Sequence, residues 1–514
     1  MDDTSAGQDR RTLLKMGGAA VLASQQTGPA GAAVTKTSDI VMMDARALAA
    51  AIKARKLSSV EVMNAFLDHI AHFNPKVNAI VALQDRDKLL GEARERDAQV
   101  ARGEIMGPLH GLPHAVKDLQ PVKGIVSTSG SPILKNFVPT ADSLPVERMR
   151  NAGAIFIGKT NTPEFGLGSH SYNPVYGVTR NPYDLSKSAG GSTGGGAVGL
   201  AMRMLPVADG SDYGGSLRNP AGWNNVFGFR TSYGVVPSPG DEVWLPSQSV
   251  TGPMARNVPD LAMLLSVMAG YDPRVPLAPE GSGARFLGDL KADFKDKRIG
   301  WLGDLNGSAP YEPGVLDVCK TALKSFESLG MHVDEAMPDG DVEAAWQAFI
   351  KLRQWTQGPS LHVYYADPAK RALLKPEAIY EIEGGMKLSG FDVTAASVTR
   401  TRWTNAVLRL FEHHDFLVMP TAQLFAFDIN EHWPHQIAGH TMRTYHEWMK
   451  AVCMITLTGC PSLAVPAGFD SRGLSMGLQI IAPVHHEMDC LRLAHAYEQV
   501  SDWTGKHLPP LLRA

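Results

Sequence analysis

The chain has 514 residues, of which 44% are apolar and 20% are charged, and its formal net charge is −3 at pH 7. This composition is typical of an ordinary globular protein with an ample core. Because the charge is nearly balanced and no Lys/Arg cluster forms a stripe, we expect no nucleic-acid partner, and no apolar run approaches the roughly 18 residues that span a bilayer.

The first 37 residues have the pattern of a twin-arginine export signal. Arg10-Arg11 precedes a short, weakly apolar stretch over residues 16–23, and Ala30-Gly31-Ala32 offers a cleavage site. These three features stand in the order that export requires. We therefore expect residues 1–37 to be a signal and disordered N-terminus, and the mature protein to be periplasmic or secreted.

The next part of the chain begins with three predicted helices. Apolar residues recur at helical spacing over residues 45–54 and 59–73, and Ser58 or Ser59 can cap the second of these helices. Residues 85–102 form a charged helix with many i,i+4 pairs, which indicates a face in contact with solvent.

From residue 108 to residue 236 the chain is rich in glycine and alternates short apolar strands with helices. The predicted elements, in chain order, are strand 114–116, helix 144–152, strand 154–158, helix 194–204 and strand 205–208. Alternation of strand and helix favours an α/β layered core.

The second half of the chain contains further elements around a less regular stretch. The predicted elements are helix 258–269, strand 298–302, helix 314–329, a buried strand ending at Pro420, strands 462–466 and 476–481, and helix 489–499. Residues 340–450 are irregular by periodicity and rich in His, Trp and Tyr. We expect this stretch, together with residues 240–249, to select the substrate.

Three short segments rich in small residues carry the functional signal. They are Gly111–Asp118 with Lys117, Gly190–Gly196 with Ser192, and Asp212–Ala221 with Ser216. A Gly-Gly-Ser turn leaves backbone N–H groups bare, so a substrate can approach them closely. Two such turns can supply a nucleophile, a hydroxyl relay and donors for a developing oxyanion, and a lysine in an apolar run can supply a base. Together these are the components of an acyl-transfer enzyme.

These segments resemble the motifs of the amidase signature family. That family places its catalytic lysine after a Gly-[ILV]-Pro-x-x-[VL] run, its bridging serine in Gly-Gly-Ser-Ser-Gly-Gly, and its nucleophile in Asp-x-Gly-Gly-Ser-x-Arg-x-Pro-Ala. The chain follows all three patterns, except that Thr193 replaces the second serine of the glycine-rich motif. The similarity runs from about residue 40 to the C-terminus and includes the late run Gly459–Gly468.

The resemblance implies a fold and a set of roles. The fold would be α/β, a single large domain over residues 38–514 with a central mixed β-sheet covered by helices on both faces. The active site would be a Ser-cisSer-Lys triad, with Ser216 as nucleophile, Ser192 as the bridge after a cis peptide bond, and Lys117 as base. The resemblance implies that no metal or organic cofactor is required, and it leaves the protein a monomer or a homodimer, since dimers are common in the family.

The oxyanion hole that the resemblance implies is the turn before and at the nucleophile. Its donors would be the backbone N–H groups of Tyr213, Gly214, Gly215 and Ser216, because no side chain covers the two glycines. Removing one donor of this kind typically raises a reaction barrier by about 3 kcal/mol. Asp212 and Arg218 flank the nucleophile, and we expect them to pair and support its loop.

The expected reaction is hydrolysis of a carboxylic or peptide amide through an acyl-enzyme. Lys117 draws a proton from Ser192, which draws one from Ser216, and Ser216 attacks the amide carbon. The proton returns through Ser192 to the leaving amine, and water hydrolyses the acyl-enzyme by the same relay. Lys117 acts as a base only when it is neutral, which burial favours, and we expect the neighbouring carboxylate of Asp118 to point away from it.

Several other residues are expected to be structural. Trp223 and Trp244 can line a pocket, but packing in the core explains them equally well. The four cysteines form no CxxC pair and are expected to be buried apolar residues rather than disulfide partners: Cys319, Cys453, Cys460 and Cys490.

Alternative functions explain less of the sequence. The run Gly190–Gly194 satisfies the G-x-S-x-G pattern of an α/β-hydrolase-type esterase, in which Ser192 would be the nucleophile and His485-His486 a candidate partner. That function leaves Lys117 and the motif around Ser216 unexplained. A nucleotide-binding loop would need a lysine that the glycine-rich run lacks, and no zinc motif has the required spacing. The export pattern by itself would also allow a non-enzymatic periplasmic binding protein.

Within the resembling family, a glutaminase subunit of a tRNA-dependent amidotransferase is a further alternative. That role needs a cytoplasmic partner and tRNA, and the export pattern disfavours both. We therefore prefer a free-standing amidase. Its candidate substrates are aliphatic or aryl carboxamides, amino-acid or peptide C-terminal amides, and cyclic or oligomeric amides, with esters as additional candidates.

Overall fold

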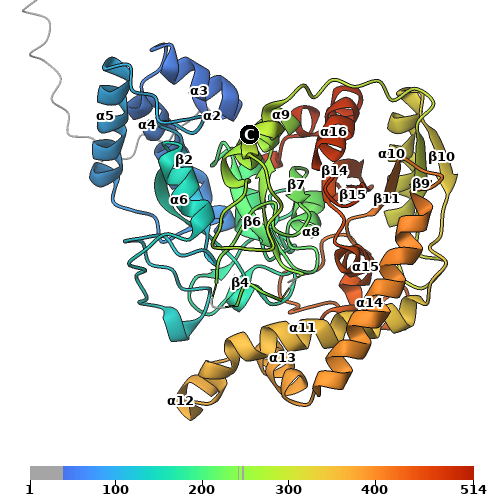
Figure 1. Cartoon of the computed structure of the whole chain (residues 1–514). Coiled ribbons are helices and arrows are strands. Elements are labelled where there is room, and N and C mark those ends of the chain that lie inside the picture. The colour runs from blue at the N-terminus through green and yellow to red at the C-terminus, as the bar shows by residue number, and fades with distance from the viewer. Residues whose placement is uncertain (1–38, 241, 246–247, 514) are drawn as a thin grey trace, which may run out of the picture. The chain divides into compact units, whose positions relative to one another are not determined.

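The computed structural model is built around a mixed eight-stranded sheet (Figure 1). The structure describes residues 39–240, 242–245 and 248–513, so the export pattern within residues 1–37 lies outside the described residues. In spatial order the strands are β10 (His332–Glu335), β9 (Arg298–Trp301), β11 (Phe416–Pro420), β15 (Ser475–Ile481), β14 (Ser462–Phe469), β7 (Phe227–Arg230), β8 (Val250–Ala255) and β6 (Ala208–Asp212). Strand β9 pairs in parallel with β10 and β11, and the other pairs are antiparallel.

A second, three-stranded sheet lies beside the central sheet and contacts it through one of its edge strands. It consists of β1 (Ile80–Val81), β3 (Ile155–Thr160) and β2 (Pro113–Lys117), and β2 runs parallel to β3. Strand β2 also contacts β6, the edge strand of the larger sheet. The two small hairpins are β4 (Tyr172–Asn173) with β5 (Gly177–Val178), and β12 (Gln436–Ile437) with β13 (His440–Thr441).

Helices cover both faces of the eight-stranded sheet, as the resemblance implied (Figure 1). On one face lie α9 (Val258–Met268), α10 (Val315–Ser328) and α16 (Glu487–Ser501), and on the other lie α8 (Arg218–Trp223) and α15 (Lys450–Thr458). The further helices are α2 (Asp39–Met42), α3 (Ala45–Lys53), α4 (Ser59–Val77), α5 (Arg86–Ala101), α6 (Leu144–Asn151), α7 (Gly194–Ala201), α17 (Trp503–Lys506) and α18 (Pro510–Arg513). Helix α4 begins with a capping box, in which the Ser58 hydroxyl accepts the Glu61 N–H at 3.0 Å and the Glu61 carboxylate accepts the Ser58 N–H at 2.8 Å.

The prediction that residues 340–450 are irregular was wrong. This stretch contains α11 (Val342–Tyr365), α12 (Pro368–Arg371), α13 (Pro376–Met386) and α14 (Gly390–Leu410). Helix α11 packs against α13, α14 and α15, so its apolar residues are spread around its circumference rather than gathered on one face. Gly358 and Pro359 inside it further hide the helical pattern.

The strand predicted over residues 205–208 was also misplaced. Strand β6 begins at Ala208 and runs through the polar residues Asp209 and Ser211 to Asp212. Polar residues lower strand propensity in the sequence, but here they find buried partners in the active site described below.

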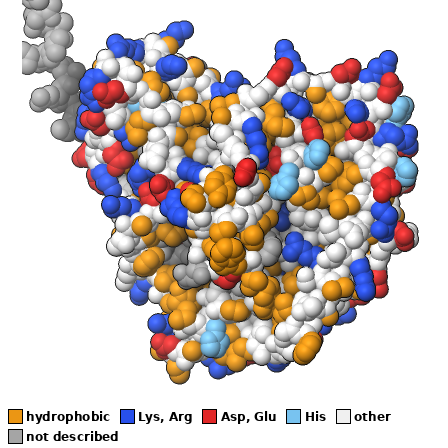
Figure 2. Space-filling model, viewed as in Figure 1, with side chains coloured by type: hydrophobic (Ala, Val, Ile, Leu, Met, Phe, Trp, Pro, Cys, Tyr) orange, Lys and Arg blue, Asp and Glu red, His pale blue; other side chains and the backbone are white. Residues whose placement is uncertain are grey.

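The distribution of surface charge and the apolar character of the helices bear on whether the protein has a binding stripe or a membrane span. On the face shown in Figure 2, acidic and basic side chains are interspersed. Among residues 39–240, 242–245 and 248–513, no helix combines the length and apolar character that crossing a membrane requires.

Candidate active site

Ser192 lies in a glycine-rich turn that directly precedes α7. The peptide bond between Gly191 and Ser192 is cis, as the family resemblance implied. Gly195, in the first turn of α7, lies so close to the chain that a Cβ there would approach the Asn161 backbone nitrogen to 2.3 Å. Glycine therefore lets α7 pack directly on the segment that follows β3, which fixes the turn ahead of it.

Lys117 ends β2, and its side-chain amine reaches this turn. The residue is fully buried, and its Nζ lies 2.8 Å from Ser192 Oγ and 2.8 Å from Thr193 Oγ1. The other two contacts of Nζ are to Ser211, at 3.2 Å from the carbonyl oxygen and 3.1 Å from the hydroxyl. Thr193 therefore supplies a hydroxyl to the lysine amine at the position where the family motif has a serine.

The environment of Lys117 favours its neutral form. Burial lowers the pKa of Lys117 to about 7, although the carboxylates of Asp209 and Asp212 oppose the shift. Asp209 also accepts the backbone N–H of Lys117 at 3.1 Å and lies 3.0 Å from His114 Nε2. The lysine is thus poised to exchange a proton near neutral pH.

The Asp118 carboxylate points away from the lysine, as predicted. It accepts the backbone N–H of Thr128 at 3.0 Å and the Thr128 hydroxyl at 2.5 Å. The nearest cation is Lys159, whose Nζ lies 3.9 Å from Asp118 Oδ1. Its carboxylate therefore does not hold Lys117 in the charged form.

The loop that carries Ser216 is held by a buried carboxylate. Asp212 accepts the N–H groups of Gly215 at 2.8 Å and Leu217 at 3.0 Å, and it binds Nε and Nη2 of Arg218 at 3.0 Å each. Burial alone would raise the pKa of Asp212, but the Arg218 and Arg230 guanidinium groups hold it well below its usual range. The predicted Asp212–Arg218 support is confirmed.

This loop geometry changes the set of candidate oxyanion donors. The Gly215 N–H was expected to face the substrate, but it is already donated to Asp212 Oδ1. Among the described residues, the N–H groups of Tyr213, Gly214 and Ser216 donate no hydrogen bond, so these three can still serve. Gly215 instead provides the turn, since its φ is +104°.

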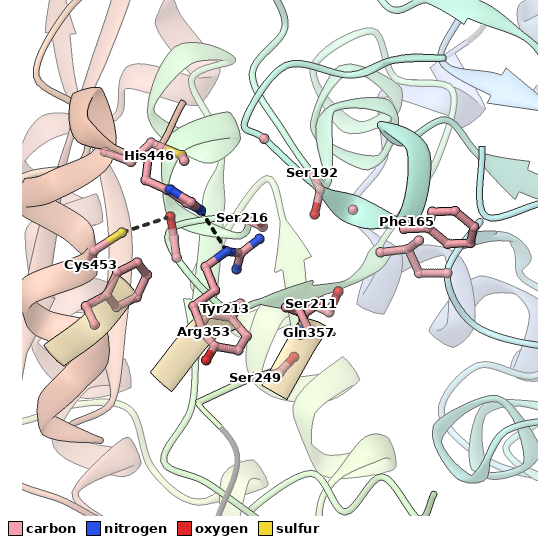
Figure 3. Close-up of a pocket in the computed structure, with 16 residues that line it drawn as sticks. Phe165, Ser192, Ser211, Tyr213, Ser216, Ser249, Arg353, Gln357, His446 and Cys453 are labelled. Carbon is pink, nitrogen blue, oxygen red and sulfur yellow. Dashed lines mark hydrogen bonds between the residues drawn. The ribbon is translucent and has the colours of Figure 1, made fainter. Parts of the chain in front are cut away.

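Ser192 and Ser216 line the same pocket, together with Ser211, Tyr213 and Gly214 (Figure 3). Within the part of the chain that the structure describes, the two hydroxyls form no hydrogen bond with each other, whereas Ser192 does bond to Lys117. The first half of the expected relay is therefore present in the free protein. The second half requires a rotation of the Ser216 hydroxyl, or an approach of the two side chains, when substrate binds.

The remaining pocket wall comes from α11, α15 and the segments around them. It combines apolar side chains with one buried cation, Arg353, and the lining residues are Leu119, Phe165, Phe349, Met449, Cys453, Gln357, His446, Ser249 and Arg353. Five of these lie in the stretch 340–450 and Ser249 lies in 240–249, the two regions in which substrate selection was expected. The sequence did not assign Arg353 or His446 to this pocket. A lone Arg carries no motif, and His446-Glu447 forms only an incomplete zinc motif.

Other residues from the sequence prediction have structural roles. Trp223 is fully buried and stacks on Trp448 with ring centroids 5.7 Å apart, whereas the Trp244 side chain is exposed. His485-His486 is exposed at the surface, so it offers no partner for Ser192 as an esterase nucleophile. The four cysteines are buried free thiols.

Comparisons with known proteins identify relatives over almost the whole chain. The amidase family matches residues 61–491. The chain is 33% identical to an acylamidase of Rhodococcus erythropolis, over 90% of this chain and 96% of that protein. It is 34% identical to a component of the glutamyl-tRNA(Gln) amidotransferase of Thermosynechococcus vestitus, over 87% of this chain and 96% of that protein. The structure resembles a bacterial aryl acylamidase of the amidase signature family with a TM-score of 0.85 and 27% identity, covering 91% of this chain and 98% of that one.

Proposed function

The chain belongs to the amidase family of hydrolases that act on carbon–nitrogen bonds, and on that premise we propose that it cleaves a carboxylic or peptide amide through an acyl-enzyme on Ser216. The observation that carries the proposal is the 2.8 Å contact between Lys117 Nζ and Ser192 Oγ, in a buried site that opens into the pocket lined by Ser216. A lysine in such a site is a base of suitable pKa for a serine relay.

The contacts of Lys117 Nζ suit its neutral form. A neutral amine has two N–H donors and one lone pair, whereas an ammonium has three donors and no acceptor. The Ser211 carbonyl can only accept, and Thr193 Oγ1 lies within 3.4 Å of that same carbonyl, which lets its hydroxyl donate there and accept from Nζ. The hydroxyls of Ser192 and Ser211 are then the two groups that can donate to the lone pair. The relay that we propose uses Ser192, because it lines the pocket with Ser216 and lies nearer to Nζ, at 2.8 Å against 3.1 Å.

In the proposed cycle, Ser216 attacks the amide carbon and loses its proton to Ser192, which passes its own proton to Lys117. The oxyanion accepts hydrogen bonds from the backbone N–H groups of Tyr213, Gly214 and Ser216. The nitrogen of the scissile bond then leaves with the proton returned through Ser192. Water attacks the acyl-enzyme by the same relay and releases the acid.

The family offers two candidates, a free-standing acylamidase and the glutaminase component of an amidotransferase, because relatives of both kinds match along most of the chain. We favour the acylamidase, since the matched structure with a TM-score of 0.85 is an aryl acylamidase and since Leu119, Phe165, Phe349 and Met449 give the pocket an apolar part that can bind an acyl or aryl group. A glutaminase component would release ammonia from glutamine and would depend on partner proteins.

The experiment is a screen of ammonia and amine release over a panel of amides that includes glutamine, with wild type, Ser216→Ala and Lys117→Ala. We expect amine release from acyl amides and a loss of about 10⁴-fold or more in kcat for each variant. Labelling by a serine-directed fluorophosphonate is expected in wild type and not in Ser216→Ala. Retained turnover in either variant would remove that residue from its role, and release from glutamine alone would favour the glutaminase.

We also propose that the protein is exported by the twin-arginine route. The support is the order of Arg10-Arg11, the weakly apolar stretch and Ala30-Gly31-Ala32 in the sequence. Cell fractionation should place the full chain outside the cytoplasm, and the double substitution Arg10→Lys and Arg11→Lys should retain it inside. Equal distribution of both forms would contradict export by this signal.

A further inference from the structure

The pocket wall opposite Ser192 contains a buried arginine with a carboxylate partner. Arg353, on α11, has a side chain that is only 7% exposed, and its Nε lies 2.8 Å from Oε1 of the fully buried Glu381 on α13. Its Nη2 donates to the Tyr445 hydroxyl at 3.3 Å, and its guanidinium lies over the Tyr213 ring at 4.7 Å from the centroid. The same Nε also lies 3.0 Å from His446 Nε2, which is the Arg353 contact drawn in Figure 3. Together these contacts hold the guanidinium beside Tyr213 of the nucleophile loop.

The Nη1 nitrogen of this guanidinium has no hydrogen-bond acceptor among the described residues. Among the hydrogen bonds of the described residues, Arg353 Nη1 donates none, although Arg353 lines the pocket. Arg218, another buried arginine near the site, shows the contrast, since its Nη1 donates to Val452 O at 2.9 Å and to Gln479 Oε1 at 2.8 Å. Arg353 Nη1 is not enclosed by protein atoms, so it opens to the pocket and indicates a position where a ligand acceptor can bind.

The charge of this wall is balanced without a ligand. Burial alone would raise the pKa of Glu381, but Arg353 and His446 lower it to about 2, so the carboxylate is ionised. Burial lowers the pKa of His446 and raises that of Tyr445 well above its usual value, so both are neutral. Arg353 and Glu381 therefore cancel. Among the described residues that line the pocket, Arg353 is the one Lys or Arg side chain, so a carboxylate at Nη1 would bring a negative charge to a cation that Glu381 already neutralises.

The direction of proton transfer in the relay indicates which half of the substrate lies next to Arg353. Because Ser192 returns the proton to the leaving nitrogen, the amine half lies on the side of Ser192 and Phe165, and the acyl half extends toward Arg353. Figure 3 shows these two groups of residues on opposite sides of the pocket.

We propose that the acyl half of the substrate carries an uncharged hydrogen-bond acceptor, such as a carbonyl oxygen, that binds Nη1 of Arg353, and that Glu381 makes the site reject a carboxylate there. This inference rests on the proposed function and deepens it, because it names the substrate class. An amide oxygen fits both demands: it accepts two N–H groups and brings no charge. Glu381 is then a specificity residue that acts through Arg353, by setting the net charge of the wall.

The test uses three p-nitroanilides whose acyl chains have the same number of heavy atoms: succinamic acid (carboxamide end), 4-methylpentanoic acid (hydrocarbon end) and succinic acid (carboxylate end). For wild type we expect kcat/KM to be about tenfold higher for the carboxamide than for the hydrocarbon, and lowest for the carboxylate. A wild-type preference for the carboxylate or the hydrocarbon, or no turnover of any of the three, would overturn the inference.

The decisive variant is Glu381→Gln, which keeps an oxygen acceptor for Arg353 and Tyr445 but removes the negative charge. We expect the ratio of kcat/KM for the carboxylate over the carboxamide to rise by about tenfold or more. Glu383→Gln is the matched control, since this carboxylate lies on the same helix but is exposed and pairs with Arg371. A ratio unchanged in Glu381→Gln, or changed equally in the control, would overturn the inference.

Two further measurements separate this inference from the proposed function. Arg353→Lys keeps the charge and lacks Nη1, so it should lose the carboxamide preference while it still hydrolyses the hydrocarbon anilide. Ser216→Ala should lose turnover of every amide that wild type hydrolyses. If Ser216→Ala loses turnover but the expected end-group preferences are absent, the acyl-enzyme proposal stands and the specificity role of Arg353 and Glu381 is refuted. If Ser216→Ala stays active, the acyl-enzyme proposal itself is refuted.

Discussion

The protonation of Lys117 should set the pH dependence of turnover. Burial lowers the pKa of this lysine to about 7, whereas an exposed lysine titrates near 10.4. The base is the neutral amine, so activity is lost as the pH falls through the pKa and is full above it. With a pKa of about 7, the neutral fraction is about a tenth at pH 6, a half at pH 7 and nine tenths at pH 8.

These fractions translate into a measurable profile. kcat/KM for an uncharged anilide should rise about tenfold between pH 6 and pH 8 and then level off. A lysine with an unshifted pKa would give a rise of about tenfold for every pH unit from 6 to 9, with no plateau. Initial rates of p-nitroaniline release, measured from pH 5.5 to 9.5 at constant ionic strength, distinguish the two curves.

A substitution sharpens the same prediction. The charge of Asp209 opposes the lowering of the Lys117 pKa, so Asp209→Asn should move the rising limb of the pH profile to lower pH. Asp118→Asn is the matched control, because this neighbouring carboxylate bonds to Thr128 instead. A limb that stays in place in Asp209→Asn, or a profile that climbs without a plateau to pH 9.5, would refute the assignment of Lys117 as the neutral base.

Three further predictions concern the groups around the relay. Thr193→Ser should keep kcat within about threefold of wild type, whereas Thr193→Val removes the hydroxyl at 2.8 Å from Nζ and should lower kcat about tenfold or more; equal rates would show that the contact is incidental. Gly215→Ala should abolish turnover, because its Cβ would lie 2.1 Å from Asn219 Oδ1 and the backbone has φ +104°; a variant with normal kcat would mean that the loop tolerates a different conformation. Asp212→Asn leaves two buried arginines without their counter-charge and should cost about 3–5 kcal/mol, seen as a lower thermal unfolding midpoint by fluorimetry, and an unchanged midpoint would contradict the support role.

The sequence was sufficient to single out the three segments that meet at the candidate site, because each is local. Lys117, Ser192 and Ser216 stand in short runs whose glycines and apolar residues specify a strand end or a turn. The periodicity of residues 59–73 likewise predicted most of α4, with its Ser58 cap. Residues of this kind are recognised from their immediate neighbours, which is the information a single sequence contains.

Long-range features could not be predicted in the same way. Arg353, Glu381 and His446 come from three separate segments, and none has a neighbour that marks it as part of a cluster. The N–H of Gly215 was assigned to the oxyanion hole because nothing in the local pattern shows that Asp212 folds back to accept it. Helix α11 was missed because a helix packed on several sides has no single apolar face.

The meeting of the two sheets explains why a lysine can serve as the base here. Strand β2 lies against β6, so the last side chain of β2 points at the residues that close β6, and the backbone N–H of Lys117 is bound by Asp209 of that strand. The start of α7 covers the same point, which removes water from the amine and supplies Ser192 and Thr193 as its partners. The desolvation that keeps about half of Lys117 neutral at pH 7 is therefore a product of the sheet contact. A substitution that opened this contact should raise the pKa of Lys117 and reduce turnover at pH 7, even if it left Lys117, Ser192 and Ser216 in the protein.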